Sequence, residues 1–361
     1  MNINLPFRKL RENSTKFTTK YTSERLCPIC DKRNHEKLEI LRKFQFFTDS
    51  RLPKKINFQT VRCKLCQIIY QNPAYNKKGL NILFKEAGMS YGTTLKSKKN
   101  QISWLKKNNL LKKNIKVLDV GCFDGSFLSL MPKYVIKFGV EIDKSVIEGA
   151  KKKFKKISFI NGNFEKFRTK EKFNLITMMH VLEHLLNPEK VLKNLFKISK
   201  KKTILVIEVP IIENHMSNSL DGFITTQHMT HFSKNSLNNL LAKCGWKILR
   251  SKIIKNYNGY RATCEKSSEK NKKINVNVNR ERQLYKKYKK KHLLSLRSIN
   301  RRISKFKVGP KTILCGGGQH LELFYLLTKF FKLSSHSTFV IIDSDIKKTG
   351  KSWRGIKILN F

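Results

Sequence analysis

The sequence predicts an α/β protein organised around a parallel sheet. Three observations support this prediction. Strand-like and helix-like segments alternate between residues 101 and 262, two pairs of closely spaced cysteines precede them, and a second strand–glycine loop–helix–strand pattern follows near residue 309. Alternation of this kind is typical of a parallel sheet with helices on both faces. At 361 residues and 40% hydrophobic content, the chain is long enough for two or three domains.

Five apolar segments in the central region are predicted strands: "IKVLDV", "KFGVEI", "ISFING", "FNLITMM" and "TILVIEV". Amphipathic spacers between them are predicted helices. Near the C-terminus, "KTILCGGGQHLELFYLLTKFF" followed by "STFVIIDSD" indicates a second, smaller α/β unit. The predicted organisation has five parts: a basic leader at 1–20, a zinc-binding domain with linker at 21–100, the α/β core at 101–262, a basic helical connector at 263–308 and a Rossmann-like unit, shorter than usual, at 309–361.

Charge is the most unusual feature of the composition. The 76 Lys and Arg residues outnumber the 25 Asp and Glu residues, so the formal net charge is +51. A nucleic-acid or anionic partner would explain this, and so would compositional drift, because the basic residues are spread along the whole chain. No apolar run is long enough to cross a membrane and no apolar signal core is present, so a cytoplasmic location is expected.

Two C-x-x-C pairs predict a structural zinc site. Each pair bends two thiolates toward one point, and tetrahedral zinc takes four such ligands. Eight cysteines in a chain without a secretory signal favour metal binding or free thiols over disulfides. Four thiolates leave no open position on the metal, so no catalytic role is expected for it. The predicted ligands are Cys27, Cys30, Cys63 and Cys66.

The segment "VLDVGCFDGSFL" predicts a nucleotide-type cofactor loop between a strand and a helix. Gly121 and Gly125 allow close approach of the backbone, and the free N–H groups of the following helix face a ligand. Glu141 ends the next strand, where an acidic side chain binds ribose hydroxyls. Asn163 and Phe164 follow the third strand and are expected to contact an adenine.

These residues resemble the class I S-adenosylmethionine-dependent methyltransferases over roughly 115–215. The resemblance rests on the strand with D-x-G-x-x-x-G, the acidic end of the second strand and the segment "HVLEHLLNP". It implies that Asp119, Gly121 and Gly125 frame the methionine part of the cofactor. His180, in the same segment, is expected at the cofactor site. His180 and His184 lie four residues apart on one predicted helical face, and for both a binding role and a structural role remain open.

The whole chain is similar to a narrower group that carries an N-terminal four-cysteine domain and a C-terminal Rossmann-like domain. Sugar C-methyltransferases acting on nucleotide-linked keto sugars belong to it. Shared stretches are "YQNP" at Tyr70, "MSYG" at Tyr91 and "HMTHFSKNSLNNLLAKCGW". Where that group has Tyr-x-Glu-His, this chain has Thr225-Thr226-Gln227-His228, so only the histidine is retained.

The resemblance implies methyl transfer from S-adenosylmethionine to a small molecule, such as a nucleotide-linked sugar or a related precursor of a cell-surface polysaccharide, by C- or O-methylation. Histidine is a suitable base near neutral pH. The candidate base is His228, with His184 and His231 as second choices. An RNA or other nucleic-acid methyltransferase and a non-catalytic cofactor-binding scaffold are the alternatives. The glycine loop "CGGGQH" is expected to contact the acceptor.

Overall fold

The computed structural model describes residues 20–45, 55–81, 94–214, 220, 222–254, 258–267 and 276–361. They form two compact units that each combine distant parts of the chain. Unit 1 falls within Met1–Ser90, His215–His231 and Asn277–Phe361, and unit 2 within Tyr91–Asn214 and Phe232–Val276. The predicted leader before residue 20 and the "MSYG" stretch at Tyr91 lie outside the described residues.

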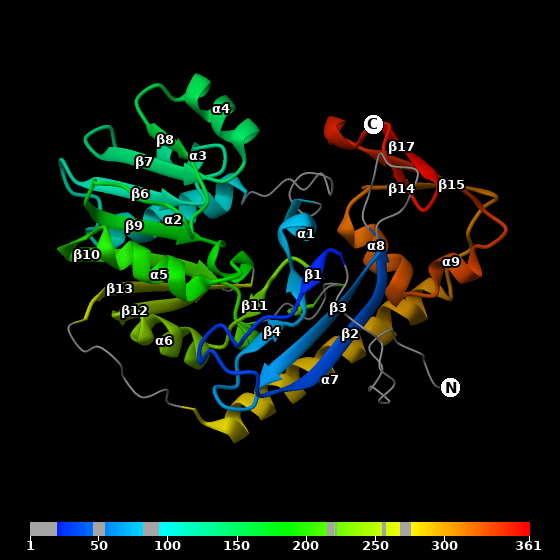
Figure 1. The fold of residues 1–361 in the computed structure, drawn as a ribbon. Helices are drawn as coiled ribbons and strands as arrows, with labels where there is room; N and C mark the ends of the chain where they lie inside the picture. Colours follow the sequence, from blue (N-terminus) through cyan, green and yellow to red (C-terminus); the bar gives the residue numbers. More distant parts are fainter. Residues whose placement is uncertain are drawn as a thin grey trace. The chain divides into compact units, whose positions relative to one another are not determined.

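Unit 2 is built on a seven-stranded sheet with the order β12-β13-β10-β9-β6-β7-β8 (Figure 1). All five strands predicted for the core are present, and neighbours among them pair in parallel. The sequence did not predict that an antiparallel hairpin, β12–β13, extends the sheet beyond β10. The strands are β6 (Lys116–Val120), β7 (Ile136–Glu141), β8 (Ser158–Asn161), β9 (Phe173–Met179), β10 (Ser199–Val209), β12 (Trp246–Ile254) and β13 (Gly259–Lys266).

Helices cover both faces of this sheet. Apolar residues of α2, α3 and α4 form one buried cluster with Val117, Leu175 and Val206 of the strands. The helices α5 and α6 contact each other on the other face (Figure 1). The fold is therefore the Rossmann-like arrangement that the alternating pattern predicts. The helices are α2 (Leu95–Lys107), α3 (Ser126–Ser129), α4 (Lys144–Lys153), α5 (Pro188–Lys197) and α6 (Lys234–Lys243), with 3₁₀ turns η2 (Leu182–His184) and η3 (Ile212–Asn214).

Local capping sets where these helices begin. Ser233 accepts a hydrogen bond from the backbone N–H of Ser236, whose side chain in turn accepts from the N–H of Ser233, so both satisfy free donors of the first turn of α6. Asp143 caps α4 by accepting hydrogen bonds from the backbone N–H groups of Ser145 and Val146.

Unit 1 contains a four-stranded antiparallel sheet with the order β11-β4-β3-β2. Its last member comes from far along the chain: β11 pairs with β4, and Thr230 lies opposite Tyr70. The boundaries predicted from the sequence place this segment in 101–262, whereas the structure groups it with unit 1. The elements are β1 (Thr22–Ser23), β2 (His35–Gln45), β3 (Lys55–Cys63), β4 (Ile69–Gln71), β5 (Ala74–Tyr75), α1 (Lys77–Asn81) and β11 (Thr230–His231).

The C-terminal part of unit 1 has the predicted strand–glycine loop–helix–strand arrangement. Its sheet has the order β14-β15-β17-β16, with β14, β15 and β17 parallel. The predicted helical connector is present as α7, which buries Tyr288, His292 and Leu296 along one face. The elements are α7 (Val278–Ile303), β14 (Lys311–Cys315), α8 (Gln319–Leu327), α9 (Phe330–Leu333), β15 (Thr338–Asp343), η4 (Ile346–Lys348), β16 (Ser352–Trp353) and β17 (Ile356–Asn360).

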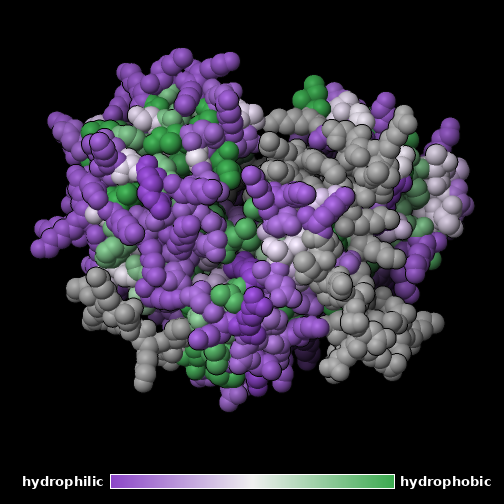
Figure 2. All heavy atoms as spheres, viewed as in Figure 1, coloured by the Kyte–Doolittle hydropathy of each residue, from purple (hydrophilic) through white to green (hydrophobic). Residues whose placement is uncertain are grey.

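Among the residues that Figure 2 colours by hydropathy, hydrophilic ones predominate, and hydrophobic ones form smaller patches between them. This matches the abundance of lysine and arginine throughout the sequence. Among the helices in the described ranges, none has the length and apolar character needed to cross a lipid bilayer.

Candidate functional site

Polar side chains gather at one edge of the seven-stranded sheet. Because β6, β7, β8 and β9 run parallel, their carboxyl ends meet at this edge. Asp119 lies near the end of β6, Glu141 ends β7 and His180 directly follows β9. In open α/β sheets ligands bind outside the carboxyl ends of the strands. Three of the predicted cofactor-site residues are therefore brought to a suitable edge.

The loop between β6 and α3 requires glycine at two positions. Gly121 has φ +74°, and a Cβ there would lie 2.4 Å from Cγ2 of Val181. Gly125 has φ +73°, and its Cβ would lie 2.5 Å from the Phe159 ring. Both the left-handed backbone and the close neighbours exclude larger residues. The glycines thus hold the loop against the sheet, which is the geometry that the sequence analysis expects of a cofactor loop.

Glu141 is bound to the backbone of that same loop. Its Oε2 accepts a hydrogen bond from the N–H of Phe123 at 3.1 Å. Its Oε1 accepts from the N–H groups of Ile142 at 2.7 Å and Asp143 at 3.1 Å. A carboxylate offers about four acceptor positions, so one remains for a ligand hydroxyl. Burial raises the pKa of Glu141, and the three backbone donors act against this rise.

Asp119 is almost completely buried, with 4% of its surface exposed. Its Oδ1 accepts a hydrogen bond of 2.6 Å from the hydroxyl of Thr177 on β9. Burial raises the pKa of Asp119 to about 7, and the nearby Glu141 charge adds to the rise. Two acidic groups therefore share a poorly solvated edge, which favours a ligand that brings positive charge or hydroxyl donors.

The predicted adenine contacts lie beyond β8. Asn163 is exposed, and its Oδ1 accepts from the backbone N–H of Glu165 at 2.8 Å. Phe164 is half-buried. Asn161 fixes the preceding turn, because its side-chain amide donates to the carbonyl oxygens of Glu141 and Ile142. The Asn163 amide and the Phe164 ring therefore lie in a region where an adenine could contact both.

His180 and His184 do not share a helical face, contrary to the expectation from their spacing. His180 has φ +56° and stands outside the short 3₁₀ turn at Leu182–His184. A left-handed residue other than glycine costs about 1–3 kcal/mol, so its surroundings must hold it there. Its Nδ1 lies 3.4 Å from Oε1 of Glu183 and its Nε2 lies 3.0 Å from Oε1 of Glu208.

Glu208 was not among the residues singled out from the sequence. It is fully buried on β10 and also accepts from the side-chain amide of Gln101 at 3.1 Å and from Nε of Arg261. Arg261 is itself 1% exposed. The available signal was an acidic residue inside the apolar strand "TILVIEV", since a buried charge needs partners.

His228 lies in unit 1, in a loop anchored to the N-terminal sheet. Its backbone N–H donates to the Thr225 hydroxyl at 3.3 Å, while the carbonyl of Thr225 accepts from the Gln71 side chain at 3.1 Å. The ring is half-buried, and its centroid lies 6.0 Å from that of His231. Burial lowers the pKa of His231 to about 3, so that ring is neutral near pH 7.

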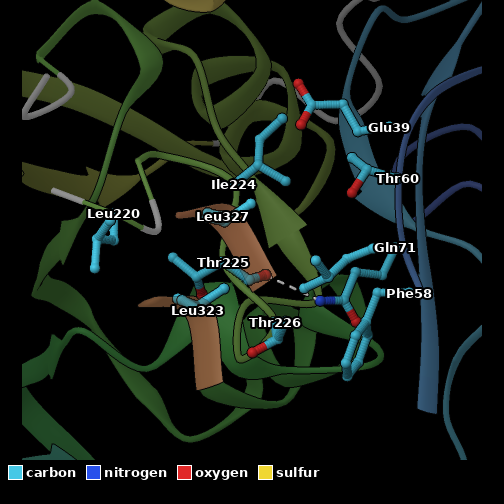
Figure 3. A pocket seen from close by; sticks show the side chains of 11 residues that line it. Glu39, Phe58, Thr60, Gln71, Leu220, Ile224, Thr225, Thr226, Leu323 and Leu327 are labelled. Carbon is cyan, nitrogen blue, oxygen red and sulfur yellow. Dashed lines mark hydrogen bonds between the residues drawn. The ribbon is translucent and has the colours of Figure 1, made fainter. Parts of the chain in front are cut away.

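A small cavity lies beside this loop in unit 1. Figure 3 shows it together with the hydrogen bond between Gln71 and Thr225. Its volume of about 20 Å³ has room for a water molecule and not for a sugar or nucleotide. The lining residues are Glu39, Leu41, Phe58, Thr60, Gln71, Leu220, Ile224, Thr225, Thr226, Leu323 and Leu327.

The four predicted metal ligands lie together in unit 1. Their sulfur atoms are within 4.8 Å of one another, with Cys27–Cys66 at 3.4 Å and Cys30–Cys63 at 3.5 Å. Both pairs have the same backbone: the residue after each second cysteine, Asp31 or Gln67, is left-handed, and its N–H donates to the first cysteine's carbonyl oxygen. The two matching turns aim all four thiols at one point.

The second glycine loop is closed by Asp343 at the end of β15. Its carboxylate accepts from the N–H of Gly317 at 2.7 Å and pairs with Lys348 at 2.9 Å. Burial favours the neutral acid, but Lys348 and the backbone donors outweigh it and lower the pKa of Asp343. Gly316 has φ +96° and open space around its Cα. The loop is ordered by its own contacts.

Comparison with known proteins agrees with the fold of unit 2. Residues 94–251 match a family model described as a methyltransferase domain. This match supports the conclusion that the protein is a methyltransferase enzyme. No curated protein matches the sequence.

Solved structures that resemble the chain include an S-adenosylmethionine-dependent methyltransferase from Clostridium acetobutylicum, with 13% identity and a TM-score of 0.40 over 52% of this chain and 97% of that one. A methyltransferase from Methanosarcina mazei has 20% identity and a TM-score of 0.39 over 45% and 98%. Magnesium protoporphyrin IX methyltransferase from Synechocystis, with bound S-adenosylhomocysteine, has 13% identity and a TM-score of 0.38 over 53% and 96%.

The environment of Asp119 predicts that this residue reduces the stability of the free protein. Between about pH 4 and pH 7, an acid whose pKa rises on folding keeps its proton in the folded chain but has lost it in the unfolded chain. The free energy of unfolding therefore decreases as the pH rises through this range. Asp119→Asn removes this effect, and its oxygen still accepts from Thr177. We expect the variant to be more stable at pH 8 by up to roughly 4 kcal/mol, with a smaller difference at pH 4.

Chemical denaturation at both pH values measures this difference. Glu148→Gln, at an exposed carboxylate on α4, is the matched control and should change stability little. A gain for Asp119→Asn that is the same at pH 4 and pH 8 would contradict the assignment of a raised pKa.

Proposed function

We propose that the protein is an S-adenosylmethionine-dependent methyltransferase that acts on a small-molecule acceptor. The observation that carries the proposal is the pair of buried carboxylates, Asp119 and Glu141, on adjacent parallel strands around a glycine loop. The methyltransferase domain match over 94–251 supports the same reading.

The donor set fits this cofactor. Burial raises the pKa of both Asp119 and Glu141, and among the causes of the Asp119 shift the only cation is Lys98. A ligand with a sulfonium, an ammonium group and ribose hydroxyls would relieve that desolvation. We infer that Asp119, Gly121 and Gly125 hold its methionine part, that Glu141 takes a ribose hydroxyl, and that Asn163 and Phe164 contact the adenine.

The bound cofactor supplies an activated methyl group with a good leaving group. The protein's task is then to align the acceptor and to remove its proton. We propose His228 as the base, because its backbone is held by Thr225 and Thr225 is held by Gln71. His231 suits this role less, since it is buried and its pKa is lowered to about 3. His184, half-buried in its 3₁₀ turn, is the other candidate.

For the acceptor we propose an anionic nucleotide-linked sugar or a related polysaccharide precursor, modified on carbon or oxygen in the cytoplasm. The resemblance to sugar C-methyltransferases supports this class, and a net charge of +51 suits an anionic substrate. The same charge is the specific observation that favours RNA as a second candidate. Methyl transfer to a panel of nucleotide sugars, with RNA as the parallel substrate, separates the two.

We propose that Cys27, Cys30, Cys63 and Cys66 hold a structural zinc ion. Zinc–sulfur bonds of about 2.3 Å place tetrahedral thiolates roughly 3.8 Å apart, close to the observed sulfur separations. Four ligands close the coordination shell, so the ion would stabilise the N-terminal sheet and take no part in catalysis.

Loss of one thiolate should remove the metal. Cys63→Ser is expected to reduce zinc content from one ion per chain to near zero and to lower the thermal unfolding temperature, since the metal contributes to folding. Cys315→Ser, at an exposed cysteine, is the control and should retain zinc. Elemental analysis of the purified proteins gives the answer, and full zinc content in Cys63→Ser would refute the site.

Substitutions in the cofactor loop should weaken cofactor binding. Gly121→Ala forces a Cβ into Val181, and Glu141→Ala removes a charged acceptor worth about 1.5–3 kcal/mol, which is roughly 10- to 100-fold in affinity. Gly149→Ala, at an open position on α4, is the matched control and should bind normally. Calorimetry with S-adenosylhomocysteine tests this, and wild-type affinity in both loop variants would remove the cofactor site.

The base is tested by a paired measurement. His228→Ala should lower methyl-transfer turnover by roughly 10²- to 10⁴-fold and leave cofactor affinity nearly unchanged, because a base contacts the acceptor. His336→Ala, at an exposed histidine in the C-terminal part, is the control. If His228→Ala turns over as the wild type does, the base must be sought at His184 or His231.

A further inference from the structure

The ring of His180 lies between two buried carboxylates, those of Glu183 and Glu208. Each ring nitrogen faces its own carboxylate: Nδ1 lies 3.4 Å from Glu183 of η2 and Nε2 lies 3.0 Å from Glu208 of β10. The side chains of Glu183 and Glu208 are 1% and 0% exposed. A neutral imidazole has one N–H, so it would leave one buried carboxylate facing a lone pair.

Glu208 is in turn fixed from two further elements. Gln101 of α2 donates to its Oε1 at 3.1 Å, and Arg261 of β13 pairs with its Oε2. Glu183 also lies 3.9 Å from Nε2 of His184. With His180 protonated, two buried carboxylates face two cations, the buried Arg261 and His180, whose side chain is 21% exposed. Burial alone would disfavour that cation, but the two carboxylates outweigh burial and raise the pKa of His180 to about 10.

This arrangement connects to the glycine loop through one residue. The backbone N–H of His180 donates to the Glu208 carbonyl oxygen at 2.8 Å, which anchors the left-handed backbone at this position. The next residue, Val181, packs so closely on Gly121 that an added Cβ there would lie 2.4 Å from Cγ2 of Val181. The position of Val181, and with it the shape of the loop, therefore depends on how His180 is held.

We propose that Glu208 is a positioning residue for the cofactor site: it holds His180 as a cation, with Glu183 on the other ring nitrogen, and so keeps Val181 against Gly121. The inference rests on the proposed cofactor function of that loop. It also assigns His180 a role other than proton abstraction, because a protonated imidazole has no free lone pair on either ring nitrogen with which to accept a proton.

Glu208→Gln tests the proposal through pH. Without the Glu208 charge, the pKa of His180 falls toward its ordinary range, so the cation persists at pH 6 and is lost by pH 9. We expect the variant to bind S-adenosylhomocysteine within about threefold of the wild type at pH 6 and at least about tenfold more weakly at pH 9. The readout is the dissociation constant of the variant divided by that of the wild type at each pH. Asp119 titrates in both proteins, so its effect cancels in this ratio.

Glu148→Gln carries the same charge change at an exposed position and should keep a ratio near one at both pH values. A ratio for Glu208→Gln that is constant from pH 6 to pH 9 means an ordinary structural role and overturns the proposal. A wild type that binds no S-adenosylhomocysteine at any pH refutes the proposed function instead.

A second measurement needs no folded variant at Glu208. The imidazole ¹⁵N shifts of His180 in the wild-type protein, assigned with His180→Asn, report its protonation directly. We expect both nitrogens to remain protonated up to pH 8. Titration of this ring near pH 6.5, the ordinary value for histidine, would overturn the proposal whether or not the cofactor binds.

Discussion

Parallel pairing of β6 with β7 and β9 is the constraint on which the candidate cofactor site depends. It brings the ends of three strands to one edge, where Asp119, Glu141 and His180 lie within a single poorly solvated region. Each of these groups is then fixed by a different means: Asp119 by the hydroxyl of Thr177, Glu141 by three backbone donors and His180 by two carboxylates. Titratable groups are held at this edge at a cost in solvation, a pattern that is common at functional sites.

Much of this edge could be predicted from the sequence because its signals are local. A glycine's backbone freedom and an acid at a strand end act over a few residues, and the β6–α3 loop and Glu141 at the end of β7 were both found in the expected places. The two C-x-x-C turns belong to the same class, since each is set within five residues.

What the sequence did not reveal depends on contacts between distant residues. Glu208 and Arg261 are 53 positions apart and meet only because β10 and β13 pair antiparallel. The hairpin that brings them together was not predicted, because an apolar segment does not indicate whether the neighbouring strand is parallel or antiparallel to it. The conformation of His180 escaped prediction for a related reason: its four-residue spacing from His184 suggests a helical face, whereas the buried partners of His180 hold it in a left-handed conformation outside the short turn.

The strand β11 has a consequence for how the chain is made. It completes the N-terminal sheet by pairing with β4 at Thr230 and Tyr70, across about 160 intervening residues. A ribosome therefore has to synthesise the central strands β6 to β10 before the sheet that carries the cysteine turns can acquire its last strand. Closing so long a loop is slow compared with forming local hairpins, so the edge of β4 stays unpaired during much of synthesis. Early capture of the proposed zinc ion by the two cysteine turns would stabilise the nascent N-terminal region before its final strand is made.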